Sequence, residues 1–339
     1  MDNLISNAIA FGLTIGVIIL LKPLALRLGL ADVPGGRKSH EGNIPLIGGI
    51  AIFVGISFAL LTLNISLSPY RCLIASLALL VVTGILDDFH ELSPRTRLFV
   101  QIFAGFLMVW WGKNSLLSLG NLFNLGEIKL GYYFAFPITI FAVVAIINAV
   151  NMTDGVDGLA GTLSFIELFY LGWLCHHAHF WPDKLIIELA LCALLGFLYF
   201  NFPFKSKASV FLGDSGSMML GFILVWFCIY LSQAGHVAAN PVIFLWIMSV
   251  PIFEISSVVF RRLIQRISPF KADRGHLHYY LLAKNMTSLQ VTLVIGSFSA
   301  VMGLIGILGE KFLINQSIMF FGFFVLFVIY FRISLKYFQ

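Results

Sequence analysis

Oxygen-bearing side chains recur at every third position in the stretch Asn148–Leu159, which reads Asn-Ala-Val-Asn-Met-Thr-Asp-Gly-Val-Asp-Gly-Leu. The residues with an amide or a carboxylate at this spacing are Asn148, Asn151, Asp154 and Asp157. A continuing helix would keep them close to one face, whereas Gly155 and Gly158 indicate that the helix ends and the backbone turns. In both cases amides and carboxylates gather at the end of a long apolar run, 134–150, where a membrane span would meet water.

Hard oxygen ligands of this kind suit Mg²⁺, which takes one or two protein carboxylates and fills its remaining positions with substrate phosphates and water. The plainer interpretation is a polar helix end capped by Asp and Gly, and a single Asp would not decide between the two. A whole cluster of such groups favours the metal site. We therefore expect Mg²⁺, with Mn²⁺ as a substitute.

Two further acidic motifs are Asp87-Asp88 and Gly213-Asp214-Ser-Gly216, which opens another apolar run. With Asp154 and Asp157 they supply five carboxylates, which repel one another unless cations intervene. The basic residues expected near them are Arg37, Lys38, Arg97 and Arg274. Carboxylates, a metal and surrounding cations form the arrangement that a diphosphate substrate needs. Backbone N–H groups at the start of the run after Gly213 could also face an anion, although a simple N-cap explains that motif equally well.

Four other ionisable residues lie in or near apolar runs. His276 and His278 stand two apart in a basic loop, which is weak evidence for a transition-metal site and favours recognition of phosphate or sugar hydroxyls. Glu254 is placed to pair with the basic end Arg261-Arg262. Glu167 lies deep in an apolar run and is a functional candidate by its position alone.

The composition identifies the class of protein. Of the 339 residues, 59% are hydrophobic and 11% are charged, and the mean hydropathy is +0.96. Soluble domains carry about 25% charged residues, so the chain is predicted to be a polytopic membrane protein. The pI near 9.0 then reflects loops rich in Lys and Arg, and we expect no nucleic-acid partner. The four cysteines show neither metal-ligand spacing nor a disulfide framework.

Hydropathy predicts an all-α fold of about eleven transmembrane helices, with ten as an alternative count, in a single domain over residues 1–339. The predicted spans are 4–26, 46–66, 70–86, 96–112, 134–151, 158–176, 184–201, 215–233, 240–259, 289–309 and 315–333. An odd number of spans places the two termini on opposite sides of the membrane.

The basic residues predict the orientation. Sixteen of the 21 Lys and Arg residues fall on the side that holds the loop after the first span. The other side holds Arg71, Lys113, Lys129, Lys184 and Lys311. The positive-inside rule therefore predicts a periplasmic N-terminus and cytoplasmic active-site loops. All the polar motifs described above fall on that same cytoplasmic side, although Lys and Arg alone decided the orientation.

In these motifs the chain resembles the polyprenyl-phosphate N-acetylhexosamine-1-phosphate transferases of glycosyltransferase family 4. These include enzymes that start O-antigen, enterobacterial common antigen and wall teichoic acid lipids, and the related phospho-MurNAc-pentapeptide translocase. The resemblance covers nearly the whole chain. Its motifs are Arg37-Lys38-Ser-His40, Asp87-Asp88, Asn148-x-x-Asn-Met-Thr-Asp-Gly-x-Asp-Gly-Leu159, Phe211-Leu-Gly-Asp-Ser-Gly-Ser217 and Asp273-Arg-x-His-Leu-His278. The last motif of the family usually ends in a further histidine, where this chain has Tyr279.

The resemblance implies a reaction in which undecaprenyl phosphate attacks the β-phosphorus of a UDP-sugar and UMP leaves. It implies that Asn151 and Asp214 touch Mg²⁺ and that the catalytic candidates are Asp87, Asp88, Asp154 and Asp157. Asp87 and Asp88 would flank the acceptor phosphate, and Asp157 would lie near uracil. The substrate-binding candidates are Arg37, Lys38, His40, Arg97, Asn148, Asp157, Arg274, His276 and His278.

The acceptor is a phosphate monoester with a second pKa of about 6, so it is already mostly a dianion at pH 7. A general base then helps little, and a covalent aspartyl intermediate stays an open alternative to direct attack.

The loop from Ser268 to His276 resembles the GlcNAc-1-phosphate branch, so UDP-GlcNAc is the expected donor. Another UDP-N-acetylhexosamine or UDP-MurNAc-pentapeptide is the alternative. The resemblance places the enzyme in the bacterial inner membrane at the first membrane step of a surface polysaccharide, and a homodimer fits the family. The competing class is a transporter of anionic substrates, but transporters hold charged sites near the membrane midplane, whereas these motifs gather at one surface.

Overall fold

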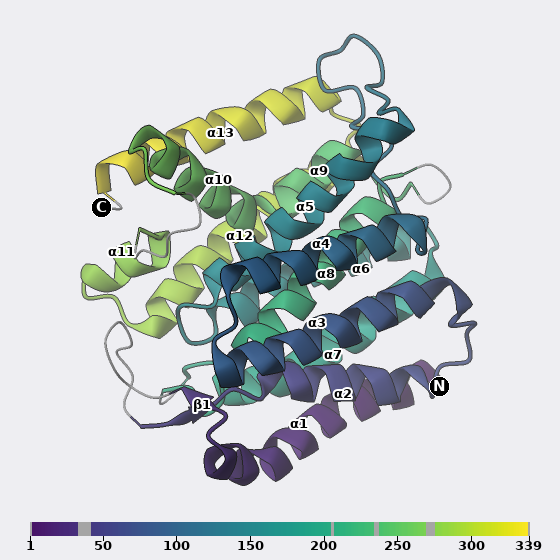
Figure 1. Ribbon diagram of the computed structural model, residues 1–339. Coiled ribbons are helices and arrows are strands. Elements are labelled where there is room, and N and C mark those ends of the chain that lie inside the picture. The colour runs from purple at the N-terminus through teal and green to yellow at the C-terminus, as the bar shows by residue number, and fades with distance from the viewer. Residues whose placement is uncertain (1, 33–41, 205–206, 234–236, 269–274, 338–339) are drawn as a thin grey trace.

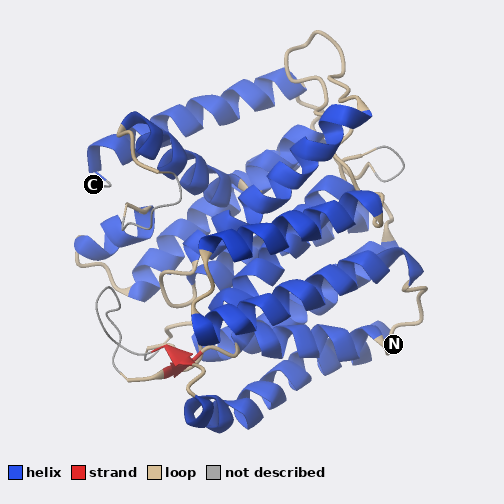
Figure 2. Cartoon of the chain, in the orientation of Figure 1, coloured by secondary structure: helices blue, strands red, loops and turns tan. Residues whose placement is uncertain are grey.

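The computed structural model describes residues 2–32, 42–204, 207–233, 237–268 and 275–337. These residues form a bundle of helices with one short two-stranded hairpin (Figures 1 and 2). The long helices are α1 (Asp2–Leu28), α3 (Arg71–His90), α4 (Pro94–Trp110), α5 (Tyr132–Thr153), α6 (Leu159–His177), α7 (Trp181–Asn201), α8 (Gly213–Tyr230), α10 (Ser249–Ile264), α12 (Ser288–Lys311) and α13 (Gln316–Tyr337). The shorter elements are β1 (Ala31–Asp32), β2 (Ile44–Pro45), α2 (Gly48–Leu60), a 3₁₀ turn (Ser68–Tyr70), α9 (Pro241–Ile247) and α11 (Leu277–Ala283).

The predicted spans correspond to helices of the structure, so the all-α polytopic prediction is confirmed. Among the described residues, seven helices are long and apolar enough to cross a membrane, or eight if the bent pair α9–α10 counts as one span. That is fewer than the eleven expected. At two of the predicted spans the structure has α2 and α4, with 13 and 17 residues. The span predicted at 240–259 is broken, because α9 and α10 meet at Met248 with a bend of 82°.

The two termini lie at opposite ends of the bundle, as the odd number of predicted spans requires (Figure 1). Three elements lie at the end of the bundle that holds the C-terminus: the hairpin β1–β2, the first turn of α4 and the whole of α11 (Figure 1). The polar motifs that the structure describes come from the helix ends and turns of this same end. We call it the site end, and the end that holds the N-terminus the remote end.

Helix α8 occupies the centre of the bundle and contacts α2, α3, α5 and α6. Nearly all of its residues from Ser215 to Ile229 are buried. Two glycines allow neighbouring helices to approach its first turn closely. A Cβ atom at Gly84 of α3 would collide with the backbone of Ser215, and one at Gly49 of α2 would collide with Gly216. The first turn of α8 is therefore held between α2 and α3.

Backbone hydrogen bonds fix the segment that leads into α8. Phe211 donates its N–H to the carbonyl of Pro45 at 2.9 Å, and its own carbonyl accepts from Gly48 at 3.0 Å. The carbonyl of Leu212 accepts from Gly49 at 2.9 Å. Since these bonds join the hairpin, α2 and the start of α8, the position of Asp214 is set by three segments that lie far apart in the sequence.

Candidate active site

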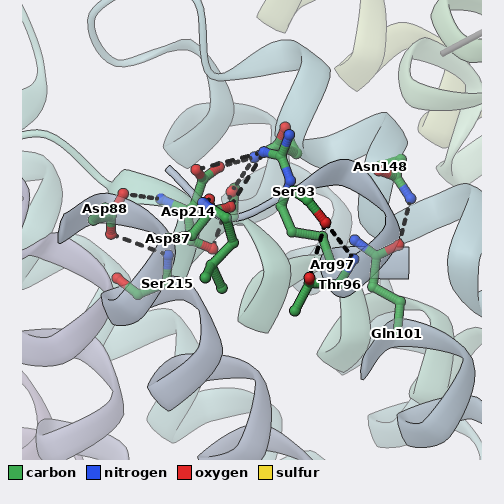
Figure 3. Close-up of polar contacts among 12 residues, drawn as sticks. Asp87, Asp88, Ser93, Thr96, Arg97, Gln101, Asn148, Asp214 and Ser215 are labelled. Atoms are coloured by element: carbon green, nitrogen blue, oxygen red, sulfur yellow. Dashed lines mark hydrogen bonds and ion pairs between the residues drawn. The ribbon is translucent and has the colours of Figure 1, made fainter. Parts of the chain in front are cut away.

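Four polar side chains from four helices meet at the start of α8. The Asp214 carboxylate accepts a hydrogen bond of 2.5 Å from Nδ2 of Asn151 on α5. The guanidinium of Arg97 on α4 lies 3.2 Å from Asp87 Oδ2 on α3 and 3.9 Å from Asp214 Oδ2 (Figure 3). Asp87 is buried, whereas Arg97 and Asp214 keep 33% and 27% of their side chains exposed. The cluster is thus closed toward the bundle and open on one side.

Asp88, the neighbour of Asp87, has a different task. Its carboxylate accepts the backbone N–H of Asp214 at 2.9 Å and that of Ser215 at 3.4 Å (Figure 3). The residue before α8, Leu212, provides no side-chain cap. Asp88 therefore caps the first turn of α8 from a neighbouring helix, which satisfies free N–H groups and sets a negative charge against the positive end of the helix dipole.

The turn between α5 and α6 carries the other two predicted acids. Asp154 follows the last residue of α5 and is half-buried. Burial, followed by the negative charges of Asp214 and Asp88, raises the pKa of Asp154 well above its ordinary value. Asp157 is tied to other segments, because its Oδ2 accepts the N–H of Ala208 at 3.0 Å and its backbone carbonyl accepts the Thr292 hydroxyl at 3.0 Å.

Asn148 lies one helical turn before Asn151 and does not bond to the carboxylates. Its Nδ2 donates to Oε1 of Gln101 on α4 at 2.6 Å (Figure 3) and to the carbonyl of Val144. Gln101 stands four residues after Arg97, on the same face of α4. The bond to Gln101 fixes α4 against α5. It therefore fixes the position of Arg97 along α4 relative to Asn151 on α5.

The two histidines lie at the start of α11, and both are buried. Nδ1 of His276 lies 3.1 Å from Oε2 of Glu254. Our expectation for Glu254 named the Arg261–Arg262 end as its partner; the structure places His276 against its carboxylate. Burial lowers the pKa of His278 to about 4, although the nearby charge of Glu254 acts in the opposite direction.

Arg37, Lys38, His40 and Arg274 fall outside the described residues. The Tyr279 ring packs against His278 with centroids 4.3 Å apart. Glu167 is fully buried in α6, and neither of its carboxylate oxygens has a hydrogen-bond partner among the described residues.

The donor atoms at the start of α8 suit Mg²⁺. Among the described residues, no group of three or more His, Cys, Asp or Glu side chains has the arrangement of a closed metal site, and Mg²⁺ does not need one, because substrate phosphates and water complete its shell. Among the described residues, Oδ2 of Asp87 is buried without a hydrogen bond and lies 3.2 Å from the cation of Arg97. An oxygen of this kind fits a cation, and Asp214 and Asn151 add hard oxygen atoms at the open side of the cluster.

Sequence reasoning missed four residues that hold the site together: Gln101, Asn201, Ser217 and Tyr330. Ser217 could have been found, because it stands three residues after Asp214 in a helix, and its hydroxyl accepts from Asn151 Nδ2 at 2.8 Å. Asn201 accepts the N–H of Gly158 at 3.0 Å and donates to Val210. No sequence signal marks Asn201, since its partners are backbone groups of two distant loops.

Comparison with known proteins adds the remaining evidence. The family model for glycosyl transferase family 4 matches residues 70–232. Over 92% of its length the chain is 39% identical to an undecaprenyl-phosphate alpha-N-acetylglucosaminyl 1-phosphate transferase of Haemophilus influenzae, of which it covers 88%. The proteins of the same name from Yersinia pestis and Escherichia coli K12 are 34% and 33% identical, over 89% and 85% of this chain and 82% and 79% of their own.

Proposed function

The chain belongs to glycosyl transferase family 4, and on this premise we propose that it transfers N-acetylglucosamine 1-phosphate from UDP-GlcNAc to undecaprenyl phosphate. An oxygen of the acceptor phosphate forms a bond to the β-phosphorus of the donor. The bond from that phosphorus to the bridging oxygen breaks, and UMP leaves with the electron pair. The lipid product is undecaprenyl-diphospho-GlcNAc, the starting unit of a cell-surface polysaccharide.

The observation that carries this proposal is the meeting of Asp87, Arg97, Asn151 and Asp214 at the first turn of α8. A diphosphate donor and a phosphate acceptor together bring several negative charges to one place. Protein carboxylates at that place need an intervening cation. The half-exposed guanidinium of Arg97 is suited to bind a phosphate oxygen through two N–H groups.

We propose Mg²⁺ as the cofactor, held by Asp214 and Asn151, with Mn²⁺ able to replace it. When bound, the ion neutralises charge on the oxygens of the transferred and leaving phosphates. The residues of the chain then position the reactants. Arg97 holds a phosphate oxygen, the Asp88 cap fixes the first turn of α8, and the Gln101–Asn148 bond fixes α4 against α5. Positioning and charge stabilisation supply most of the rate in phosphoryl transfer.

The first test is turnover of radiolabelled UDP-GlcNAc by purified protein with undecaprenyl phosphate in detergent. The expected products are radiolabelled lipid and one UMP per lipid formed. UDP-GalNAc and UDP-MurNAc-pentapeptide serve as competing donors and should be used at least tenfold less efficiently. If no donor gives labelled lipid, and the protein instead moves the substrate across the membrane of a vesicle, the chain is a transporter.

Orientation in the bacterial inner membrane is a separate part of the proposal. Asn285, between α11 and α12, should face the cytoplasm, and Asn124, in the loop before α5, should face the periplasm. In intact cells an impermeant thiol reagent should therefore label Asn124→Cys but not Asn285→Cys. The parent chain is the control, because Cys72, Cys175 and Cys228 are buried and Cys192 is partly buried. The reverse labelling pattern would invert the orientation.

A further inference from the structure

Glu254 is a buried carboxylate of α10 that receives three hydrogen bonds from two other segments. Its Oε2 lies 3.1 Å from Nδ1 of His276, and its Oε1 accepts the backbone N–H of Leu277 at 3.1 Å. The hydroxyl of Tyr330, on α13, also donates to Oε1. An ionised carboxylate only accepts, so the His276 proton is held on Nδ1. This one group joins α10 and α13 to the first residue of α11.

The contact with Glu254 continues through two stacked rings to the turn that carries the acids. The rings of His276 and His278 are nearly parallel, with an angle of 7° and centroids 5.4 Å apart. His278 is 3% exposed, and its Nε2 has no hydrogen-bond partner among the described residues. A Cβ atom at Gly155 would collide with that nitrogen, so the ring lies directly against the turn.

Apolar contacts hold the other face of α11 to the same turn. Val156 in the turn and Leu159 at the start of α6 form a small buried cluster with Val250 of α10. Leu277 and Leu281 of α11 pack against this cluster. The apolar contacts fix the distance between α11 and the turn, but they do not fix how the histidine rings are rotated. A directional bond is needed for that, and Glu254 supplies it.

The position of His278 relative to the membrane indicates which substrate it meets. The turn follows the last residue of α5, and α11 precedes α12, so both lie beyond the ends of the spans on the site side. A water-soluble sugar nucleotide enters from that side, whereas a lipid phosphate approaches from within the bilayer. An unpartnered buried nitrogen is costly unless a ligand supplies its hydrogen bond.

We propose that Glu254 is a positioning residue for the sugar-nucleotide side of the site. It fixes the ring of His276 and the first N–H of α11, and through the stacked rings it holds Nε2 of His278 toward the bound donor. This inference rests on the proposed function for the identity of the donor, while the anchoring of α11 by Glu254 is independent of it.

Glu254→Gln is the decisive variant. Glutamine keeps the size of the side chain but brings an N–H₂ group among three donors, so at least one of them loses its acceptor. The matched control is Glu167→Gln, which changes the other fully buried glutamate of the spans, far from α11 and without a hydrogen-bond partner in the described part of the chain. Both variants are purified in detergent and compared with the parent chain by melting temperature and size-exclusion chromatography.

The kinetic readout separates positioning from general damage. In Glu254→Gln we expect kcat/KM for UDP-GlcNAc to fall about tenfold or more, as for a misplaced contact, while KM for undecaprenyl phosphate stays within twofold. Because Glu254 acts through His276, adding Glu254→Gln to His276→Gln should have little further effect. The proposal is wrong if donor kcat/KM is unchanged, if both substrates suffer equally, or if the two substitutions are additive.

A second readout does not depend on the reaction. Hydrogen exchange of residues 277–283 should accelerate in Glu254→Gln and stay unchanged in Glu167→Gln. If the parent chain turns over no UDP-sugar, the proposed function fails, yet this comparison still decides whether Glu254 anchors α11. Should Glu254→Gln not fold, Tyr330→Phe removes one of the three donors and should give a smaller change in the same direction. Unchanged exchange and unchanged donor kinetics in a folded variant would refute the proposal.

Discussion

At the remote end of the bundle, polar side chains pair across helix ends. The Tyr70 hydroxyl donates to Asp183 at 2.7 Å, and Asn114 donates to the carbonyl of Trp226 at 3.0 Å. Asn240 donates to Glu310 at 3.0 Å. At the site end, by contrast, carboxylates stand next to one another with Arg97 between two of them. Buried atoms such as Asp87 Oδ2 and His278 Nε2 have no hydrogen-bond partner in the described part of the chain.

The difference teaches how burial and function are related in this molecule. Buried polar groups are normally satisfied, and those that are not require an explanation. At the remote end most polar side chains have partners, although Trp226 Nε1 is an exception among the described residues, and these polar residues hold loops to helices. The site end departs from the rule where acids and histidines from several segments converge. If ligands complete that end, substitutions there should reduce turnover with little loss of stability, and substitutions at the remote end should do the reverse.

Removal of divalent cations should produce the largest effect. Excess chelator should lower turnover by several orders of magnitude, because a bound cation contributes several kcal/mol of transition-state stabilisation. Added Mg²⁺ or Mn²⁺ should restore the rate, and added K⁺ should not. The measurement is the initial rate of labelled lipid formation against free Mg²⁺. Full activity in excess chelator would show that the carboxylate cluster does not hold a cation needed for turnover.

Asp214→Asn should follow in size. The side chain keeps its shape and loses the charge at the open side of the cluster, so turnover should fall about 10²- to 10³-fold while the melting temperature changes little. The matched control is Asp183→Asn, the same substitution at the remote end, which should leave turnover within twofold. A folded Asp214→Asn enzyme with near-normal turnover at limiting Mg²⁺ would show that Asp214 is not a metal ligand.

Asp88→Asn should have a smaller effect, because an amide oxygen can still accept the N–H of Asp214. We expect about a tenfold loss of turnover, from the lost charge at the N-terminus of α8.

A carboxylate already bonded to two backbone N–H groups, as in Asp88, is also poorly placed to act as a nucleophile. With UDP-GlcNAc but no lipid acceptor, the enzyme should therefore release no stoichiometric burst of UMP. A burst that disappears in Asp87→Asn or Asp88→Asn would establish a covalent intermediate.

The sequence predicted the fold to a large extent because the membrane limits the choices. Long apolar runs must be helices, since lipid offers no partner for backbone groups. The sharing of one end by Asp87, Asn151 and Asp214 follows from counting spans. The bend at Met248 was missed because the apolar run continues through it, although Pro251, three residues later, is of a type that interrupts helices.

The sequence also could not predict which partner each acidic residue of the site faces. Adjacent residues of a helix point about 100° apart, so Asp87 faces Arg97 while Asp88 faces the start of α8. Which of the two faces the cluster depends on how α3 is rotated against α8, and Gly84 sets that contact. Glu254 was expected beside arginines near in sequence, whereas its contact with His276, 22 residues further along the chain, is a tertiary feature with no local signal.

Tyr70→Phe should give the smallest effect on turnover and is the sharpest test of the remote end. The variant removes the hydroxyl that donates to Asp183 and leaves the ring in its buried position. A hydrogen bond to a charged group contributes about 1.5–3 kcal/mol, so the melting temperature in detergent should fall by several degrees. Both substrates should keep their kcat and KM, because the pair lies at the opposite end of α3 from Asp87. A loss of turnover larger than about threefold at unchanged stability would mean that the two ends are coupled through α3, and the contrast between them would then fail.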